Sequence, residues 1–76
     1  MRNKIINILT EIRPEFDFKE NLNFIENGML DSFDIVLLVS ILEETFSIII
    51  DGLDVNPSNF YSVNSIIELI NKNNKK

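Results

Sequence analysis

The first helical stretch is residues 3–13, where apolar side chains recur three and four positions apart. This spacing places them on one face of a helix. Asn3 is the expected N-cap, and Pro14 disfavours helical geometry at Arg13, so the helix is predicted to end there. The apolar face comprises Ile5, Ile8, Leu9 and Ile12, with Ile6 at its edge.

The main helix is predicted over residues 32–46, the most apolar part of the chain. Asp31 is a good N-cap, and Asp34 places negative charge in the first turn, where the helix end is positive. One stripe faces the core: Ile35, Leu38, Val39, Leu42 and Phe46. A second apolar line, Phe33, Leu37 and Ile41, lies well round the helix and is flanked by Asp34, Ser40 and Glu44. Such a helix is either buried on nearly all sides or packs on the core with one face and on a partner with the other.

The last helix is predicted from Val63 to about Asn71, with Ser62 as its cap. Its core face comprises Val63, Ile66, Ile67 and Ile70, with Leu69 at the edge. Residues 71–76 are polar and are expected to form a frayed tail.

The connection over residues 14–30 is too apolar for a free linker, because it carries Phe16, Phe18, Leu22, Phe24 and Ile25. It is expected to pack over the helix ends, with a short turn near residues 21–25 and an unusual backbone angle at Gly28.

In the second connection, residues 48–50 have high strand propensity but no second strand to pair with. They are predicted to form an extended segment that plugs the core. Asp51 and Gly52 turn the chain, Leu53 and Val55 anchor one helical turn, and residues 57–61 form another. The whole chain, residues 1–76, therefore reads as one all-helical domain with three main helices, a short third helix and a long first loop.

Composition narrows the chemistry, because the chain contains no Cys and no His. Disulfides, thiolate or imidazole metal sites and serine–histidine nucleophilic catalysis are excluded, and an enzyme is not expected. The net charge of −5 disfavours nucleic acid and anionic membrane surfaces. It favours either a basic partner or solubility alone. No apolar run approaches the roughly 18 residues of a membrane span. The absence of Cys and of a secretory signal fits the cytoplasm.

Ser32 stands at the mouth of the main helix between two acidic residues, Asp31 and Asp34. It has no base near it in sequence, so it is better placed to be modified by another enzyme than to attack a substrate. From chemistry alone it is a cofactor attachment site, a plain helix cap or a kinase site.

Nearly the whole chain resembles the acyl and peptidyl carrier protein family. The resemblance rests on Gly28-Met29-Leu30-Asp31-Ser32-Phe33, followed by Val36, Leu38-Val39, Leu42-Glu43-Glu44 and Phe46. It is closer to the D-alanyl carrier subgroup at residues 30–33 and at Asn59-Phe60-x-Ser62-Val63-x-x-Ile66. The resemblance implies a small four-helix bundle of the acyl carrier protein type.

The resemblance also implies that Ser32 receives 4′-phosphopantetheine from coenzyme A through a phosphopantetheinyl transferase. The thiol of this arm would then carry an acyl or aminoacyl thioester. The cargo is expected to be D-alanine or another amino acid, delivered by an adenylating ligase. The alternatives are a fatty or polyketide acyl group, handled by acyl-transfer or condensing enzymes, and, in a different class, a cofactor-free helical interaction module.

Asp31 is implied to position the transferase, and the acidic residues Asp31, Asp34, Glu43 and Glu44 to dock basic partner enzymes. The chain departs from fatty-acid carriers at Leu37, where glutamate is common, and at Ser40, where methionine is common. These departures favour partners that read apolar contacts, so Phe33, Leu37 and Ile41 are the expected contact surface. The protein is expected to be a monomer.

Overall fold

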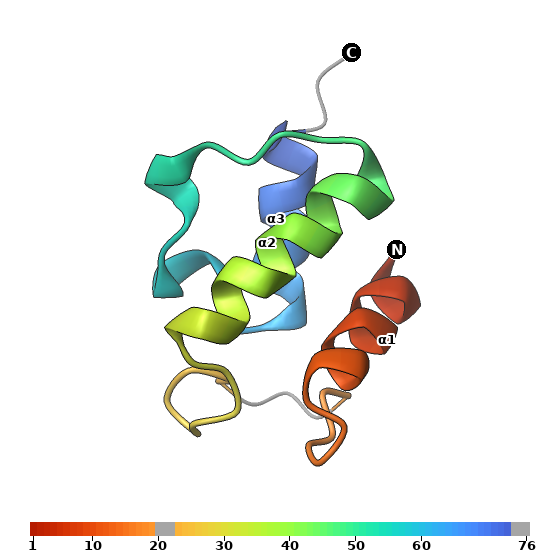
Figure 1. Ribbon diagram of the computed structural model, residues 1–76, viewed down its shortest axis with the longest axis vertical. Coiled ribbons are helices and arrows are strands. Elements are labelled where there is room, and N and C mark those ends of the chain that lie inside the picture. The colour runs from red at the N-terminus through yellow and green to blue at the C-terminus, as the bar shows by residue number, and fades with distance from the viewer. Residues whose placement is uncertain (20–22, 74–76) are drawn as a thin grey trace.

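The computed structural model describes residues 1–19 and 23–73. They contain three α-helices, α1 (Arg2–Ile12), α2 (Ser32–Phe46) and α3 (Val63–Asn73), and two short 3₁₀ turns, η1 (Gly52–Asp54) and η2 (Pro57–Asn59). Figure 1 shows α2 running obliquely in front of α3, with α1 beside them and the first connection below. The all-helical prediction is confirmed for the described residues. A four-helix bundle is not confirmed, because two 3₁₀ turns stand where a short third helix was expected.

Helix α1 begins earlier than predicted. Its N-cap is Met1, which makes no side-chain cap bond, and the amide of Ile5 donates to the Met1 carbonyl at 3.1 Å. The assignment of Asn3 as N-cap is therefore wrong, since the first helical turn closes before it. The helix ends at Ile12, one residue before the predicted end, and Arg13 is its C-cap. Ile6, expected at the edge of the apolar face, is buried, whereas Ile12 is only half-buried.

Helix α2 has the predicted bounds, and two reciprocal hydrogen bonds between Asp31 and Asp34 fix its start. The Asp34 amide donates to Oδ1 of Asp31 at 2.9 Å, and the Asp31 amide donates to Oδ2 of Asp34 at 3.1 Å. This capping box satisfies two amides that the helix itself leaves unpaired. The helix ends at Phe46, and its C-cap is Ser47, whose φ of 54° is left-handed.

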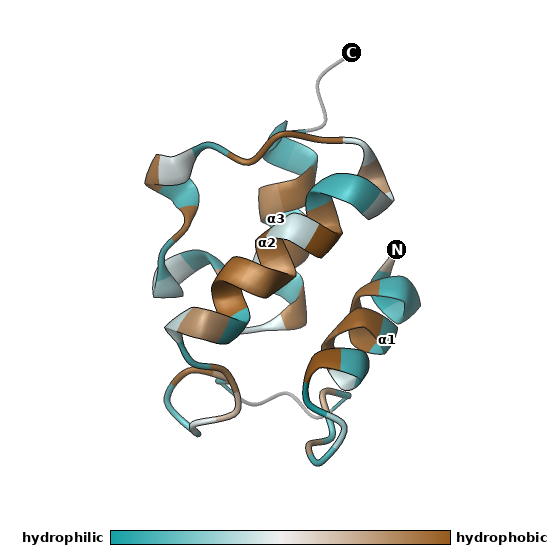
Figure 2. Ribbon diagram, viewed as in Figure 1, coloured by the Kyte–Doolittle hydropathy of each residue, from teal (hydrophilic) through white to brown (hydrophobic). Residues whose placement is uncertain are grey.

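The two apolar lines of α2 differ in burial. The core stripe is buried at Ile35, Leu38 and Leu42 and half-buried at Val39 and Phe46. Phe33 and Leu37 are exposed, so the helix is not buried on all sides. Ile41, expected beside them, is half-buried against the core, and Val36, which was not expected there, is exposed. In Figure 2 much of α2 is brown, in keeping with apolar residues on both its inner and its outer side.

Helix α3 is capped as predicted, by reciprocal bonds at 3.1 Å between the amide of each of Ser62 and Ser65 and the hydroxyl of the other. It continues to Asn73, so residues 71–73 are helical and the tail prediction is wrong for them; residues 74–76 lie outside the described part. Leu69 is buried and Ile67 is half-buried, the reverse of the predicted order.

The first connection packs inward as expected. Phe18 and Phe24 are buried, with ring centroids 5.0 Å apart in an edge-to-face arrangement. Phe16 and Ile25 are half-buried, while Leu22 and the start of the predicted turn at residues 21–25 lie outside the described residues. Gly28 has a φ of +71°, which confirms the predicted unusual angle.

The second connection plugs the core only in part. Ile48 and Ile50 are buried, but Ile49 between them is exposed, because side chains alternate in an extended segment. Val55 is half-buried as an anchor of its turn, whereas Leu53 is 87% exposed, so its predicted anchoring role is wrong. Among the described helices, none is long and apolar enough to cross a membrane.

Candidate functional site

Ser32 is the first residue of α2, and it is exposed. The N-cap is Asp31, and the capping bonds run between Asp31 and Asp34. The interpretation of Ser32 as a plain cap is therefore wrong. Its hydroxyl is not needed to hold the helix end, so it is available to chemistry from outside.

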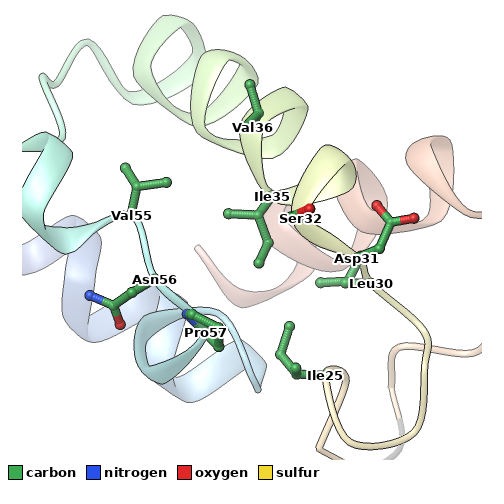
Figure 3. Close-up of a pocket in the computed structure, with 9 residues that line it drawn as sticks. All are labelled: Ile25, Leu30, Asp31, Ser32, Ile35, Val36, Val55, Asn56 and Pro57. Atoms are coloured by element: carbon green, nitrogen blue, oxygen red, sulfur yellow. The ribbon is translucent and has the colours of Figure 1, made fainter.

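A cleft of about 230 Å³ opens beside Ser32. Figure 3 shows Ser32 and Asp31 on one side of it and the chain around η2 on the other. Most of its lining is apolar: Ile25, Leu30, Ile35, Val36, Val55 and Pro57. Among the described residues, the lining also includes the polar side chain of Asn56 besides Asp31 and Ser32. The side-chain oxygen of Asn56 already accepts from the backbone amide of Ser58, and its side-chain nitrogen donates to the Leu53 carbonyl. The cleft thus offers an apolar surface with a polar mouth at the serine.

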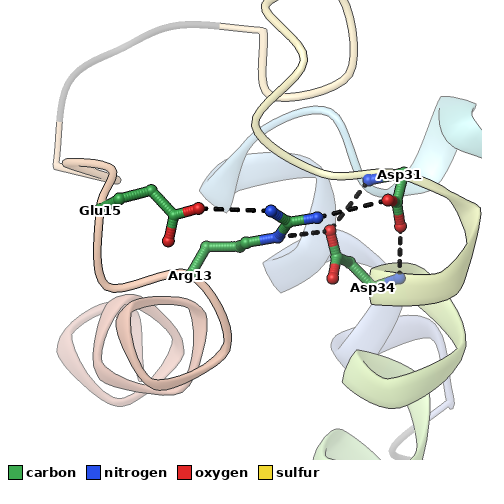
Figure 4. A network of polar contacts seen from close by, with 4 residues as sticks. All are labelled: Arg13, Glu15, Asp31 and Asp34. Carbon is green, nitrogen blue, oxygen red and sulfur yellow. Dashed lines mark hydrogen bonds and ion pairs between the residues drawn. The ribbon is translucent and has the colours of Figure 1, made fainter.

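Arg13 joins the end of α1 to the mouth of α2 (Figure 4). Its Nε donates to Oδ2 of Asp34 at 2.9 Å, and its two terminal nitrogens contact Glu15 and Asp31 at 3.3 Å each. Sequence reasoning used Arg13 only as a helix end and missed this cluster. No local signal reveals it, because Arg13 and Asp34 are 21 positions apart and meet only through the path of the first connection.

The same contacts shift the ionisation of two groups. Hydrogen bonds to Asp34 and then Glu15 raise the pKa of Arg13 above its ordinary value. A hydrogen bond from the Asp34 backbone lowers the pKa of Asp31, and the positive charge of Arg13 adds to this. Asp31 therefore carries its negative charge beside Ser32 even in moderately acidic solution.

The apolar docking residues expected from the sequence lie partly together. Phe33 is 82% exposed and Leu37 50% exposed, and with Val36 they form the outer face of α2. A shallow hollow of about 440 Å³ lies there, lined also by Asp34 and Ser40. Ile41 is half-buried and does not line this hollow. The sequence does contain a signal for Val36, because it is an apolar residue three positions after Phe33 and directly before Leu37.

The acidic docking residues occupy different environments. Glu44 is exposed, and the Asp31 side chain is 61% exposed. The Asp34 side chain is only 13% exposed and is paired with Arg13. Oε2 of Glu43 accepts a hydrogen bond from the Ile50 amide at 2.8 Å. Asp34 and Glu43 thus both make contacts within the domain, Asp34 with Arg13 and Glu43 with the Ile50 amide.

An exposed serine at the mouth of the central helix in a small all-helical domain is the arrangement expected of acyl and peptidyl carrier proteins. Comparison with known proteins agrees. The D-alanyl carrier proteins of two strains of Lactobacillus delbrueckii subsp. bulgaricus are each 30% identical to this chain over 74 residues, which cover 95% of this chain and 91% of the relative. No protein-family model and no solved structure matches the chain. The chain belongs to the acyl and peptidyl carrier protein family, in its D-alanyl subgroup, which confirms the resemblance seen in the sequence.

Proposed function

We propose that this protein carries an acyl or aminoacyl group as a thioester on a 4′-phosphopantetheine arm attached to Ser32. One observation carries the proposal: Ser32 is exposed at a helix mouth whose cap is made by its neighbours Asp31 and Asp34. The hydroxyl can therefore be esterified without loss of the bonds that hold the helix end. When bound, the arm supplies a thiol, which the chain lacks because it has no Cys.

The residues around Ser32 fit such an arm. A phosphodiester on Ser32 stands at the positive end of the 15-residue helix α2, where negative charge is favoured. Asp31 and Asp34 oppose it, but Arg13 lies against both and offsets part of their charge. The apolar lining of the adjacent cleft suits the methyl and methylene groups of the arm.

The modification requires a transferase, because the groups beside Ser32 are carboxylates, and the lowered pKa of Asp31 makes it a weak base for the serine hydroxyl. The Oγ of Ser32 attacks the phosphorus of coenzyme A that bears the pantetheine. A new phosphorus–oxygen bond forms to Ser32, and the bond to the adenosine bisphosphate portion breaks, so that this portion leaves. The proton of the hydroxyl passes to a base of the transferase.

The cargo in this proposal is D-alanine, activated by an adenylating ligase. The support is the subgroup, since both relatives are named D-alanyl carrier proteins. The chain itself takes no part in activation; it binds successive partner enzymes and presents the same arm to each.

Partner docking is proposed for the outer face of α2. The exposed side chains Phe33, Val36 and Leu37 provide apolar contact area next to Ser32. Exposed negative charge is provided by Asp31 at the start of α2 and by Glu44 near its end. Exposed apolar contacts of this kind contribute most of the affinity, while charges guide the encounter. Ile41, Asp34 and Glu43 are proposed to act mainly by shaping this face.

The direct test is intact mass spectrometry after incubation with coenzyme A and a broad-specificity phosphopantetheinyl transferase. We expect the wild type to gain one phosphopantetheine and Ser32→Ala to gain none. Ser58→Ala is the matched control, because it removes an exposed serine that lines neither the cleft at Ser32 nor the hollow on the outer face of α2. An unchanged wild-type mass, or an equal gain in Ser32→Ala, contradicts the proposal.

The cargo is tested on the modified protein with ATP, an adenylating D-alanine ligase and D-alanine. The expected product carries one alanyl group, which hydroxylamine removes because thioesters are labile to it. Acceptance of fatty acyl groups with rejection of D-alanine would leave the carrier role in place and refute the cargo.

A further inference from the structure

The guanidinium of Arg13 uses three different nitrogen atoms on three carboxylates, as Figure 4 shows. Nε contacts Asp34, one terminal nitrogen contacts Asp31, and the other contacts Glu15. These partners belong to the first turn of α2, to its N-cap and to the start of the first connection. One side chain thus links three parts of the chain around the helix mouth.

The three contacts are unequal. The Asp34 side chain is 13% exposed, against 61% for Asp31 and 52% for Glu15, so solvent screens the pair with Asp34 least. The pair with Asp34 is also the shortest, at 2.9 Å. Arg13 therefore holds chiefly the carboxylate of Asp34.

Oδ2 of Asp34 has a second role, since the atom that accepts from Arg13 also accepts from the backbone amide of Asp31 at 3.1 Å. Asp31 immediately precedes Ser32. A connected path of hydrogen bonds therefore runs from the end of α1, through Asp34, to the backbone that carries the serine.

We propose that Arg13 is a positioning residue for the modification of Ser32, an inference that rests on the proposed function. By holding Asp34 in the capping box, it keeps the peptide between Leu30 and Asp31 in one orientation. This fixes the backbone that leads into Ser32, so that the hydroxyl meets the transferase in a reactive geometry. Small displacements of a reacting group are costly, as a shift of about 1 Å can slow a reaction about a hundredfold.

This role depends on the shape of the guanidinium and not only on its charge. A lysine ammonium is a compact charge on a flexible stem and cannot reproduce three contacts made by a planar fork. Arg13→Lys therefore keeps the positive charge and loses the planar fork, whereas Arg13→Gln loses both the charge and the fork.

The matched control is Lys72→Gln. Lys72 pairs with Asp54 at 3.1 Å, and the Asp54 side chain is 18% exposed, close to the value for Asp34. Neither residue lines the cleft at Ser32. The control thus breaks an ion pair whose acidic partner is similarly buried, while the Lys72 side chain is 65% exposed against 32% for Arg13.

The experiment measures kcat and KM for transfer from coenzyme A to Ser32, at a temperature where every variant is folded by circular dichroism. A second readout is amide hydrogen exchange at Asp34 in the unmodified protein. We expect kcat to fall about threefold to tenfold in both Arg13 variants, within the range that misplacement of a reacting group produces. KM should change little, exchange at Asp34 should accelerate, and Lys72→Gln should match the wild type.

Three results would overturn the inference: a wild-type kcat in Arg13→Gln, full recovery of kcat in Arg13→Lys, or an equal loss in Lys72→Gln. In each case the wild type still accepts the group, so the proposed function stands. A wild type that is never modified refutes the proposed function and this inference with it.

Discussion

The Nε atom of Arg13 lies 2.9 Å from Oδ2 of Asp34, and this contact ties the end of α1 to the first turn of α2. The two residues are 21 positions apart, with the whole first connection between them. Asp34 therefore serves the fold at the point where Ser32 is presented. Its expected contact with partner enzymes stays a prediction.

Acid should weaken the fold through Asp31. Its pKa is lowered from the ordinary value of 3.8 by the hydrogen bond from the backbone amide of Asp34 and by the positive charge of Arg13. A carboxyl with a lowered folded pKa contributes stability that is fully present above its unfolded pKa and is lost as pH falls through the folded pKa. The urea midpoint of the wild type should therefore fall more steeply than that of Asp31→Asn between about pH 5 and pH 3, because Asn still caps a helix but does not titrate. Parallel pH profiles would contradict this assignment.

Glu43 should matter for stability, although its sequence position suggests only docking. Its Oε2 accepts from the Ile50 amide at 2.8 Å and so holds the extended segment after α2. Glu43→Ala should lower the free energy of unfolding by about 1 kcal/mol, because the amide loses its partner, and Glu43→Gln should lower it less. Glu44→Gln, at the exposed neighbouring position, is the control in urea titrations. A Glu43→Ala protein as stable as the control would count against this role.

The two glycines should respond in opposite ways to alanine. Gly28 has a φ of +71°, and a Cβ there meets no atom within 4 Å, so the only cost is backbone strain. Gly28→Ala should destabilise by about 1 kcal/mol. Gly52 also has open space but no positive φ, and Gly52→Ala should be neutral or stabilising by up to about 1 kcal/mol. Thermal unfolding of both variants tests the pair, and equal shifts would argue against strain at Gly28.

The outer face of α2 should be separable from stability. Phe33→Ser and Leu37→Ser alter exposed side chains, so each should change the free energy of unfolding by no more than about 0.5 kcal/mol. If this face docks partners, each should raise the KM of an adenylating ligase for the modified protein about fivefold or more, as hot-spot residues do. Ile49→Ser and Leu53→Ser, at positions 83% and 87% exposed outside α2, are matched controls. An equal effect in the controls would remove the special role of α2.

Added salt tests the part played by charge in docking. With a net charge of −5 and exposed Asp31 and Glu44, association with a basic partner should slow as salt shortens the screening length below about 10 Å. Stopped-flow association rates at several ionic strengths measure this. A rate that does not depend on salt would assign recognition to Phe33, Val36 and Leu37 alone.

The sequence by itself determined the elements whose signals are local. The bounds of α2 followed from the Asp31 cap and the apolar spacing after it, and Ser62 was correctly placed as the cap of α3. Capping and helical spacing involve residues within about four positions of one another, so they can be read before the chain folds. The position of Ser32 at a helix mouth and the family followed from the same residues.

Only the tertiary structure decided which side chains face water and which charges meet. Val36 proved exposed and Ile41 half-buried, although both are apolar residues of one helix. Leu53 points outward from its turn, and α3 runs on through residues expected to fray, with Lys72 paired to Asp54. The Arg13 cluster depends on how the first connection returns the chain to α1. Burial and long-range ion pairs arise from the packing of segments distant in sequence, so spacing along the chain does not determine them.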